Sequence, residues 1–311
     1  MSADDPVRSA FERDGYVVLP GHLGAEDLSA ARGDLDDLFP SAAAFHGEVD
    51  PERNARFRDE FGGIVDFPFE SVHLSALAVH PRIVELVERL LDTTDLRVYS
   101  IEAWAKYTGA ADYDQPLHRD YLNHSLLVPA DDRAPDQVEC FVYLDDVPSG
   151  LGPTAYLPQT VAGAMPALPN WYPRTDGEID ETHPTWAATE GRPDLYDREV
   201  LAVGPAGTVA SYRIETFHRG TALTEPEGAR FTVHVSYRRA EAEWIGRRGW
   251  TDQANTERWR RFVVQATPRQ LELFGFPPVG HPYWTPRTLD GLAERYPGLD
   301  TRPWQPPDAP D

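Results

Sequence analysis

The chain has 311 residues, with 51 acidic and 29 basic side chains and a net charge of −22. This negative charge works against non-specific binding to nucleic acid or to anionic membranes. Hydrophobic residues make up 41% of the chain and aromatic residues 11%, a composition that favours a folded protein over an intrinsically disordered one. We therefore expect a folded protein without a nucleic-acid or membrane partner, and the composition leaves its oligomeric state open.

Two further features bear on the compartment. Cys140 is the single cysteine, so an internal disulfide is impossible, and its apolar surroundings "VECFVYL" predict a buried, inert thiol. The N-terminus has no basic start followed by an apolar stretch, and no segment approaches ~18 consecutive apolar residues. A cytoplasmic protein is expected.

Residues 1–95 are predicted to be mainly helical. "DDPVRSAFERDGY" is typical of a short helix, with Pro6 in its first turn and Gly15 as its stop. "YVVLP" follows as a buried strand, and "GAEDLSAARGDLDDLF" predicts one amphipathic helix. "HPRIVELVERLLD" carries one apolar stripe at helical spacing and is the clearest helix of this part.

Short β-type runs replace the helices from about residue 96. They are "LRVYSIEAWAKY", "QVECFVYLDDV", "TAYLP", "REVLAV", "GTVASYRI" and "RFTVHVSYRR". Such runs without helical spacers predict an antiparallel sandwich or barrel. A loop at 162–197, rich in proline, acids and tryptophan, interrupts them, and loops of this length are usually functional.

Helical patterns return after residue 250 in "NTERWRRFVVQA", "TPRQLELFGF" and "TLDGLAERY". We therefore predict a single domain that is mainly β with flanking helices, an α+β class. Its parts are N-terminal helices at about 1–95, a β core at about 96–240 and a C-terminal helical extension at about 241–311. The long loop and the extension are expected to shape or cover a substrate pocket.

The stretch "QPLHRDYLNH" contains candidate metal ligands. Side chains at i and i+2 of a strand share a face, so His118 and Asp120 can offer a nitrogen and an oxygen to one metal. The pair is weak evidence by itself, but His218 follows the later strand run "GTVASYRI". Two histidines and one carboxylate on a β scaffold form the facial triad of non-haem iron(II) oxygenases.

The strand after His218 alternates strictly. Its apolar face consists of Phe231, Val233, Val235 and Tyr237, and its polar face of Arg230, Thr232, His234, Ser236 and Arg238. If the apolar face packs on the core, the polar face looks at water or at a polar cavity. Arg230 would need an anion there, because an unpaired buried charge is very costly. A guanidinium is suited to bidentate recognition of a carboxylate.

Four motifs in order resemble the phytanoyl-CoA dioxygenase family of Fe(II)/2-oxoglutarate-dependent oxygenases. They are "FERDGYVVLPGHL", "QPLHRDY", "VYLDDVPSGLGPTAYLPQT" and "FHRGTALTEPEGARFTVHVSYR". The resemblance implies a double-stranded β-helix (jelly-roll, cupin-like) core, with His118, Asp120 and His218 as the catalytic metal ligands and Arg230 as the 2-oxoglutarate anchor. It also implies hydroxylation of a small organic substrate by O2, with decarboxylation of 2-oxoglutarate to succinate.

Three further residues are candidate cosubstrate contacts under this resemblance. Lys106 matches the position of a polar residue that touches 2-oxoglutarate in relatives, with an exposed strand end as the alternative. Thr154 and Tyr143 lie on core strands and are expected near the cosubstrate, with core packing equally open for Tyr143. The chain departs from the family at residues 158–161, which read Pro-Gln-Thr-Val instead of Pro-Gly-Ser-His, and at Leu151-Gly152 instead of Asn-Gly.

Other polar and aromatic residues have open roles. His124 is expected to be a solvent-facing loop residue, with a side chain that faces the substrate or supports the metal ligands as the alternative. His234 either lines the cavity or is structural. The loop aromatics either pin the loop to the body or stack on substrate; they are Trp171, Tyr172 and Trp186. A basic cluster is either a solvated face or an attractor of anionic substrate; it consists of Arg238, Arg239, Arg247 and Arg248.

Two other function classes compete with the oxygenase. One is a 2-oxoglutarate-independent, metal-dependent jelly-roll enzyme such as an isomerase, against which Arg230 counts. The other is a non-catalytic ligand-binding barrel, which has no need for three metal ligands. Asp120 disfavours halogenation, because related halogenases lack the carboxylate, and leaves hydroxylation, desaturation and cyclisation. The sequence does not identify the substrate or say whether it is carrier-linked.

Overall fold

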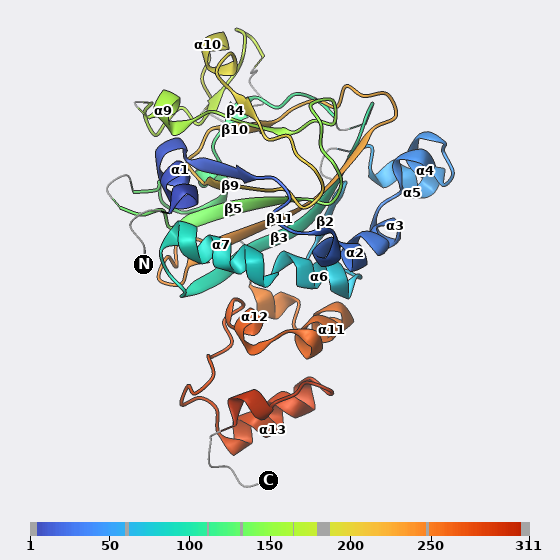
Figure 1. The fold of residues 1–311 in the computed structure, drawn as a ribbon, viewed down its shortest axis with the longest axis vertical. Coiled ribbons are helices and arrows are strands. Elements are labelled where there is room, and N and C mark those ends of the chain that lie inside the picture. The colour runs from blue at the N-terminus through green and yellow to red at the C-terminus, as the bar shows by residue number, and fades with distance from the viewer. Residues whose placement is uncertain are drawn as a thin grey trace.

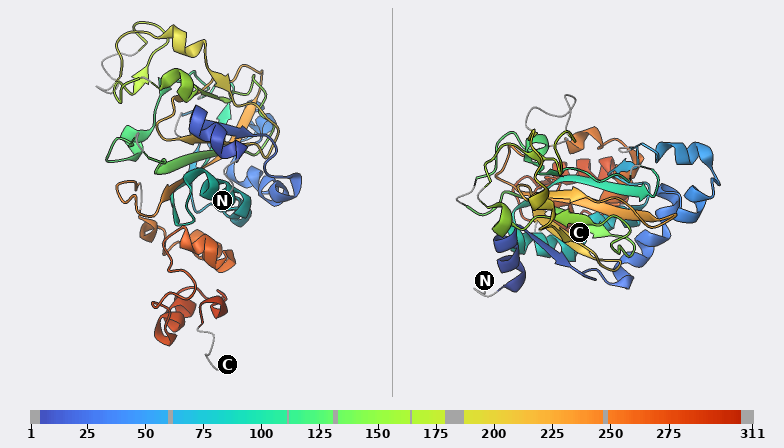
Figure 2. Two further views of the ribbon diagram at one scale, coloured as in Figure 1. Left: turned by 60° about the vertical axis from the view of Figure 1, so that its left-hand side comes forward. Right: turned by 90° about the horizontal axis from the view of Figure 1, so that it is seen from above.

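Two antiparallel sheets form the centre of the molecule (Figures 1 and 2). The computed structural model describes residues 5–59, 62–110, 112–130, 133–163, 165–178, 187–246 and 249–305. The larger sheet has the order β1 (Tyr16–Leu19), β9 (Val209–Arg213), β5 (Gln137–Tyr143), β11 (Ala229–Arg239), β3 (Leu96–Tyr107) and β2 (Ile64–Asp66). The smaller sheet has the order β7 (Trp171–Tyr172), β4 (Leu117–His118), β10 (His218–Gly220), β6 (Thr154–Tyr156) and β8 (Val200–Leu201).

Helices cover the larger sheet on the side away from β4 and β10, as Figure 1 shows for α2, α6 and α7. The helices that precede the β core are α1 (Pro6–Asp14), α2 (Ala25–Gly33), α3 (Leu35–Leu38), α4 (Ala42–His46), α5 (Pro51–Arg56), α6 (Val72–Ala78) and α7 (Pro81–Leu91). The later ones are α8 (Tyr121–His124), α9 (Gln159–Ala162), α10 (Pro193–Tyr196), α11 (Glu257–Gln265), α12 (Pro268–Glu272) and α13 (Pro286–Arg295), with 3-10 turns at Trp250–Asp252 and Arg302–Trp304.

The alternation of β11 is confirmed. Phe231, Val233 and Val235 point into the main core, where the apolar stripe of α7 packs as well. Each fully buried side chain of this size stabilises the fold by roughly 1.5–3 kcal/mol. The opposite face of β11 carries the polar residues and looks toward the smaller sheet. The sheet therefore separates an apolar core from a polar interior.

One predicted helix is divided in the structure. The segment at 24–39 forms α2 and α3, separated at Asp34, so the expectation of a single amphipathic helix is wrong. The carboxylate of Asp34 accepts hydrogen bonds from Ser71 Oγ at 2.7 Å and from the ring of His73 at 2.9 Å. These contacts hold the Asp34 side chain against the start of α6, a long-range effect that helical periodicity does not register.

Cys140 is fully buried, as predicted. Burial raises the pKa of its thiol to about 12, and its sulfur lies 3.1 Å from Ser211 Oγ. The thiol is therefore protonated and inert near neutral pH.

The C-terminal extension packs on the helical side of the larger sheet. Phe262 of α11 meets Phe67 with ring centroids 4.9 Å apart, and Phe274 stacks on Phe67 at 5.4 Å. Figure 1 places α11 to α13 at the far end of the molecule from β4 and β10. Among the helices the structure describes, none is long and apolar enough to cross a membrane.

Candidate metal centre

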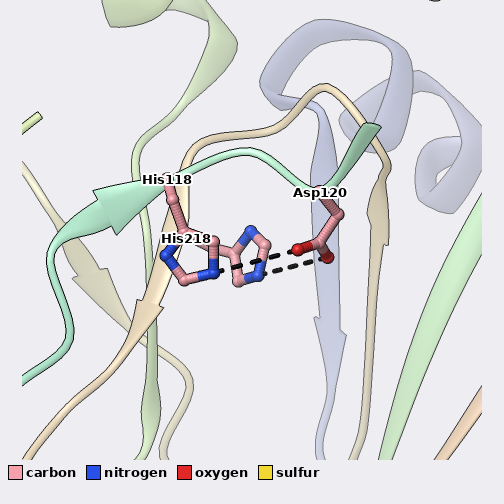
Figure 3. Close-up of side chains that lie close together, drawn as sticks. All are labelled: His118, Asp120 and His218. Carbon is pink, nitrogen blue, oxygen red and sulfur yellow. Dashed lines mark ion pairs between the residues drawn. The ribbon is translucent and has the colours of Figure 1, made fainter. Parts of the chain in front are cut away.

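His118, Asp120 and His218 come together between the sheets (Figure 3). His118 ends β4 and His218 begins β10, and the two are direct partners in the antiparallel register. Asp120 Oδ2 lies 3.4 Å from His218 Nε2, and Asp120 Oδ1 lies 3.8 Å from His118 Nε2. One potential ligand atom from each residue lies within 4.8 Å of the others, which suits a single metal ion.

The backbone route to this arrangement differs from the predicted one. Strand β4 stops at His118, and Asp120 has a helical conformation, with φ −89° and ψ −18°, at the start of α8. Its N–H donates to Ile214 O at 3.2 Å, which fixes the turn. The prediction that His118 and Asp120 lie together is therefore confirmed, but the expectation that both lie on one strand is wrong.

Arg119 turns away from the centre, as its position between the two ligands suggests. Its guanidinium lies over the ring of Phe217, 4.2 Å from the centroid. Nη2 donates to three backbone carbonyls of the long loop, those of Pro166, Ala167 and Pro169. The residue therefore ties the loop to the ligand segment.

Backbone carbonyls fix the orientation of both histidine rings. His118 Nδ1 lies 2.8 Å from Pro116 O, and His218 Nδ1 lies 3.1 Å from Thr216 O. Because a carbonyl oxygen only accepts hydrogen bonds, each Nδ1 carries the proton and each Nε2 presents its lone pair to the centre. The hydroxyl of Tyr212 donates to Asp120 Oδ2 at 2.9 Å and orients the third ligand.

Protonation also favours metal binding. Burial, aided by the neighbouring His218, lowers the pKa of His118 to about 4, so its imidazole is neutral at pH 7. Burial alone would raise the pKa of Asp120, but the surrounding histidines and the Tyr212 hydroxyl bring it below its usual range. A neutral imidazole and an ionised carboxylate are the states in which these side chains bind metals.

A cavity of about 360 Å³ opens beside the triad. Arg230 and Lys106, cross-strand partners on β11 and β3, line one end of it. Arg230 is only 5% exposed, and within the described residues its Nε and Nη1 have no hydrogen-bond partner. A buried guanidinium with unsatisfied donors fits a ligand that brings a carboxylate. Thr154 of β6 lines the same cavity.

Gly220 and Gln115 shape this end of the cavity, and neither was predicted as a site residue. Gly220 N–H donates to Gln115 Oε1 at 2.9 Å, and Gln115 N–H donates to Gly220 O at 3.0 Å. A Cβ on Gly220 would lie 2.9 Å from Gln115 Oε1 and 3.4 Å from Lys106 Nζ. The glycine therefore keeps space in front of the lysine.

Tyr143 is fully buried, and its hydroxyl donates to Ala202 O at 2.6 Å. Its side chain is not among those that line the cavity within the described residues. The geometry favours core packing, and a cosubstrate contact of Tyr143 stays a prediction.

His124 and His234, the two histidines without an assigned role in the sequence analysis, both line the cavity. His234 lies between the rings of Phe141 and Trp104, with centroid distances of 3.8 and 4.6 Å. His124 Nδ1 lies 3.8 Å from Glu139 Oε1, so the expectation of a solvent-facing His124 is wrong. The turn of α8 directs its side chain inward.

The long loop backs the centre from outside. Trp171 pairs with His118 in the sheet register and stacks on its ring at 4.6 Å, while Tyr172 packs on Phe217 at 5.5 Å. These contacts pin the loop to the body, whereas Trp186 lies outside the described residues. Within the described parts of 162–197 and 241–305, no residue lines the cavity, and the expectation that these segments shape or cover the substrate pocket stays a prediction.

The remaining candidates have structural contacts. Arg238 donates to Ala240 O at 2.9 Å, and Arg239 donates to Leu91 O, so these two arginines brace the chain rather than forming a solvated face. Arg247 and Arg248 lie outside the described residues. The two departures from the family motif, at Leu151-Gly152 and at 158–161, lie in ordered backbone. Gly152 adopts a left-handed φ of +65°, and residues 159–162 form α9.

Comparison with known proteins identifies the family. A family model described as Phytanoyl-CoA dioxygenase (PhyH) matches residues 11–227, a span that includes all three triad residues. The chain belongs to the phytanoyl-CoA dioxygenase family. Arg230 lies just beyond the matched span, on the strand that follows His218. No curated protein sequence matches the chain.

Solved structures of PhyH-like enzymes share the fold. The epimerase SnoN, in complex with Fe3+, alpha ketoglutarate and nogalamycin RO, is 22% identical, with 81% of this chain and 89% of that chain covered and a TM-score of 0.54. The non-heme alpha ketoglutarate dependent carbocyclase SnoK is 18% identical, with coverages of 82% and 92% and a TM-score of 0.53.

Proposed function

We propose that this member of the phytanoyl-CoA dioxygenase family is an Fe(II)- and 2-oxoglutarate-dependent oxygenase that hydroxylates a small organic substrate. One observation carries the proposal: the triad and the unsatisfied guanidinium of Arg230 face the same cavity. Both sheets contribute residues to this cavity, and we infer that they are the halves of a double-stranded β-helix.

Each residue has a defined part in this proposal. His118, Asp120 and His218 would hold iron(II), and Arg230 with Lys106 would bind the distal carboxylate of 2-oxoglutarate. The iron would supply oxygen activation coupled to decarboxylation of 2-oxoglutarate to succinate. The protein contributes oriented imidazoles and a fixed position for the cosubstrate. Its carboxylate ligand leaves no vacant protein position for a halide, which disfavours halogenation.

Succinate formation in air tests the proposal. Protein with Fe(II), 2-oxoglutarate and ascorbate should release succinate slowly even without substrate, and His218→Ala should reduce the release to the metal-free level. His281→Ala, an exposed histidine, is the matched control and should behave as wild type. Wild-type protein that forms no succinate above the metal-free level contradicts the proposal and favours a 2-oxoglutarate-independent enzyme or a binding protein.

Product mass separates the reaction types once a substrate is found. Hydroxylation adds one oxygen atom, desaturation or cyclisation removes two hydrogens, and epimerisation leaves the mass unchanged. A product with one added oxygen, formed in step with succinate, is the expected result.

A further inference from the structure

The charge of the side chains on the polar face of the larger sheet changes from positive to negative along the strands. Arg230 faces Lys106 at one end of β11, while six residues further along Ser236 faces Glu139 of β5. At a rise of about 3.3 Å per residue the two ends are separated by roughly 20 Å. Glu102 of β3 lies opposite His234, near the acidic end. All of these side chains line the same cavity.

Glu139 is 4% exposed and is held by neutral donors. Gln137 Nε2 donates to Oε1 and Ser236 Oγ donates to Oε2. His124 Nδ1 lies 3.8 Å from Glu139 Oε1. No lysine or arginine of the described chain forms an ion pair with Glu139. The ion-pair partner of this buried carboxylate among the described residues is thus a histidine beyond hydrogen-bond distance, and because burying a carboxylate is costly, the site gains from a closer cation supplied by a ligand.

Glu139 stands close to the metal centre. It is the register partner of Tyr212, whose hydroxyl holds the ligand Asp120. Glu102 accepts a hydrogen bond from Trp104 Nε1 at 3.1 Å, and the rings of Trp104 and Phe141 both line the cavity. Carboxylates beside aromatic rings form a surface that suits an organic ammonium group. The unsatisfied guanidinium of Arg230 independently marks the same cavity as a place for ligands.

Resting on the proposed function, we propose that the substrate carries a protonated amine that binds Glu139 and Glu102. The opposite charges at the two ends then sort the two ligands. The dianionic 2-oxoglutarate binds at Arg230 and Lys106, and the cationic substrate binds beyond the triad. The same two carboxylates disfavour a substrate with an anionic group at that end.

Calorimetric titration with a matched probe series tests the charge preference. Tyramine, tyrosol and 4-hydroxyphenylacetate share a phenol ring and differ in carrying an amine, an alcohol or a carboxylate. Each is titrated into metal-free protein and, without oxygen, into the complex with Fe(II) and 2-oxoglutarate. Tyramine should bind about tenfold more tightly than tyrosol, a difference of about 1.4 kcal/mol, and the carboxylate should bind most weakly.

Charge-removing variants locate the preference. Glu139→Gln should bring tyramine to the affinity of tyrosol, whereas Glu85→Gln on the exposed side of α7 should keep the difference. Glu102→Gln is a second variant, because Glu139→Gln disturbs a buried hydrogen-bond cluster. Retained affinity for 2-oxoglutarate shows that each variant is folded.

Two results overturn the inference. One is tyramine binding no tighter than tyrosol to wild-type protein, including no detectable binding of any probe up to its solubility. The other is an amine preference that survives in both cavity variants. An amine preference in protein that forms no succinate in air contradicts only the proposed function, so the two failures are distinguishable.

Discussion

Hydrogen bonds outside the triad determine how its three ligands point. Tyr212 illustrates this, because its buried hydroxyl donates to Asp120 Oδ2 at 2.9 Å while its ring lies 4.4 Å from that of His218. Tyr212→Phe keeps the ring and removes the hydrogen bond. We expect metal affinity to fall by about tenfold or more, as for other partners of metal ligands.

Competition with a chromophoric chelator measures this effect. Tyr283→Phe, which removes the hydroxyl of a half-exposed tyrosine, is the control and should leave the affinity unchanged. Equal metal affinity in Tyr212→Phe and wild type would show that the hydroxyl does not position Asp120.

Arg230 is proposed to bind the cosubstrate rather than the metal. Arg230→Gln removes the buried positive charge but keeps a polar side chain. We expect the dissociation constant for 2-oxoglutarate to rise at least about tenfold, because a charge-assisted hydrogen bond contributes roughly 1.5–3 kcal/mol. Metal affinity should not change. Calorimetry with Arg302→Gln as an exposed control checks this, and an unaltered 2-oxoglutarate affinity in Arg230→Gln would refute the anchor role.

His234 makes stability depend on pH. Burial, with the nearby Arg230 and Lys106, holds the pKa of His234 well below its ordinary value. Below about pH 6.5 the imidazole of His234 is therefore protonated in the unfolded chain but stays neutral in the folded chain. The free energy of unfolding falls as the pH falls. Urea titration of the metal-free protein measures the free energy of unfolding at each pH. Between about pH 7 and pH 5 this free energy should fall by about 1–2 kcal/mol less in His234→Gln than in wild type.

His281→Gln should retain the wild-type pH dependence of unfolding. If His234→Gln retains it as well, His234 is not the group responsible.

The helices and strands that could be predicted are those long enough to repeat their apolar pattern several times. Strands β3 and β11 and helix α7 each repeat their apolar pattern several times, and their bounds match the predicted runs closely. Strands β4 and β10 span only two and three residues, so no period exists to detect. Their pairing depends on contacts between segments a hundred residues apart, which a local pattern does not contain.

The described part of the C-terminal extension stabilises the fold without lining the cavity. Phe262 of α11 packs between Phe67, Trp259 and Phe274. Phe262→Ala should therefore lower the free energy of unfolding by about 3–5 kcal/mol.

Affinity for 2-oxoglutarate should remain at the wild-type level in folded Phe262→Ala protein. Arg260→Ala, at an exposed position of the same helix, is the control for denaturant unfolding. A tenfold loss of 2-oxoglutarate affinity in Phe262→Ala at full folding would contradict the separation of extension and site.

At the scale of the molecule, folding brings the triad and Arg230, which are far apart in the sequence, to one cavity. The three candidate ligands were predictable because metal-binding residue types stand next to strand patterns in a family-like order. The same order led to Arg230, whose role as the cosubstrate anchor stays a prediction. The inward turn of His124 and the break at Asp34 depend on tertiary contacts, and so were not predictable. Glu139 carried one usable signal: it is the single charged residue in the otherwise apolar run "VECFVYL". A charged residue that must be buried there is paired or functional.

The most direct test of the central claim is anaerobic absorption spectroscopy. Iron(II) bound by the triad and chelated by 2-oxoglutarate should give a weak visible metal-to-ligand charge-transfer band when both are added to the protein. His118→Ala should abolish the band, and Arg230→Gln should shift its appearance to higher 2-oxoglutarate concentration. A wild-type protein that shows no band at saturating iron and 2-oxoglutarate, or a His118→Ala variant that retains it, would contradict the account.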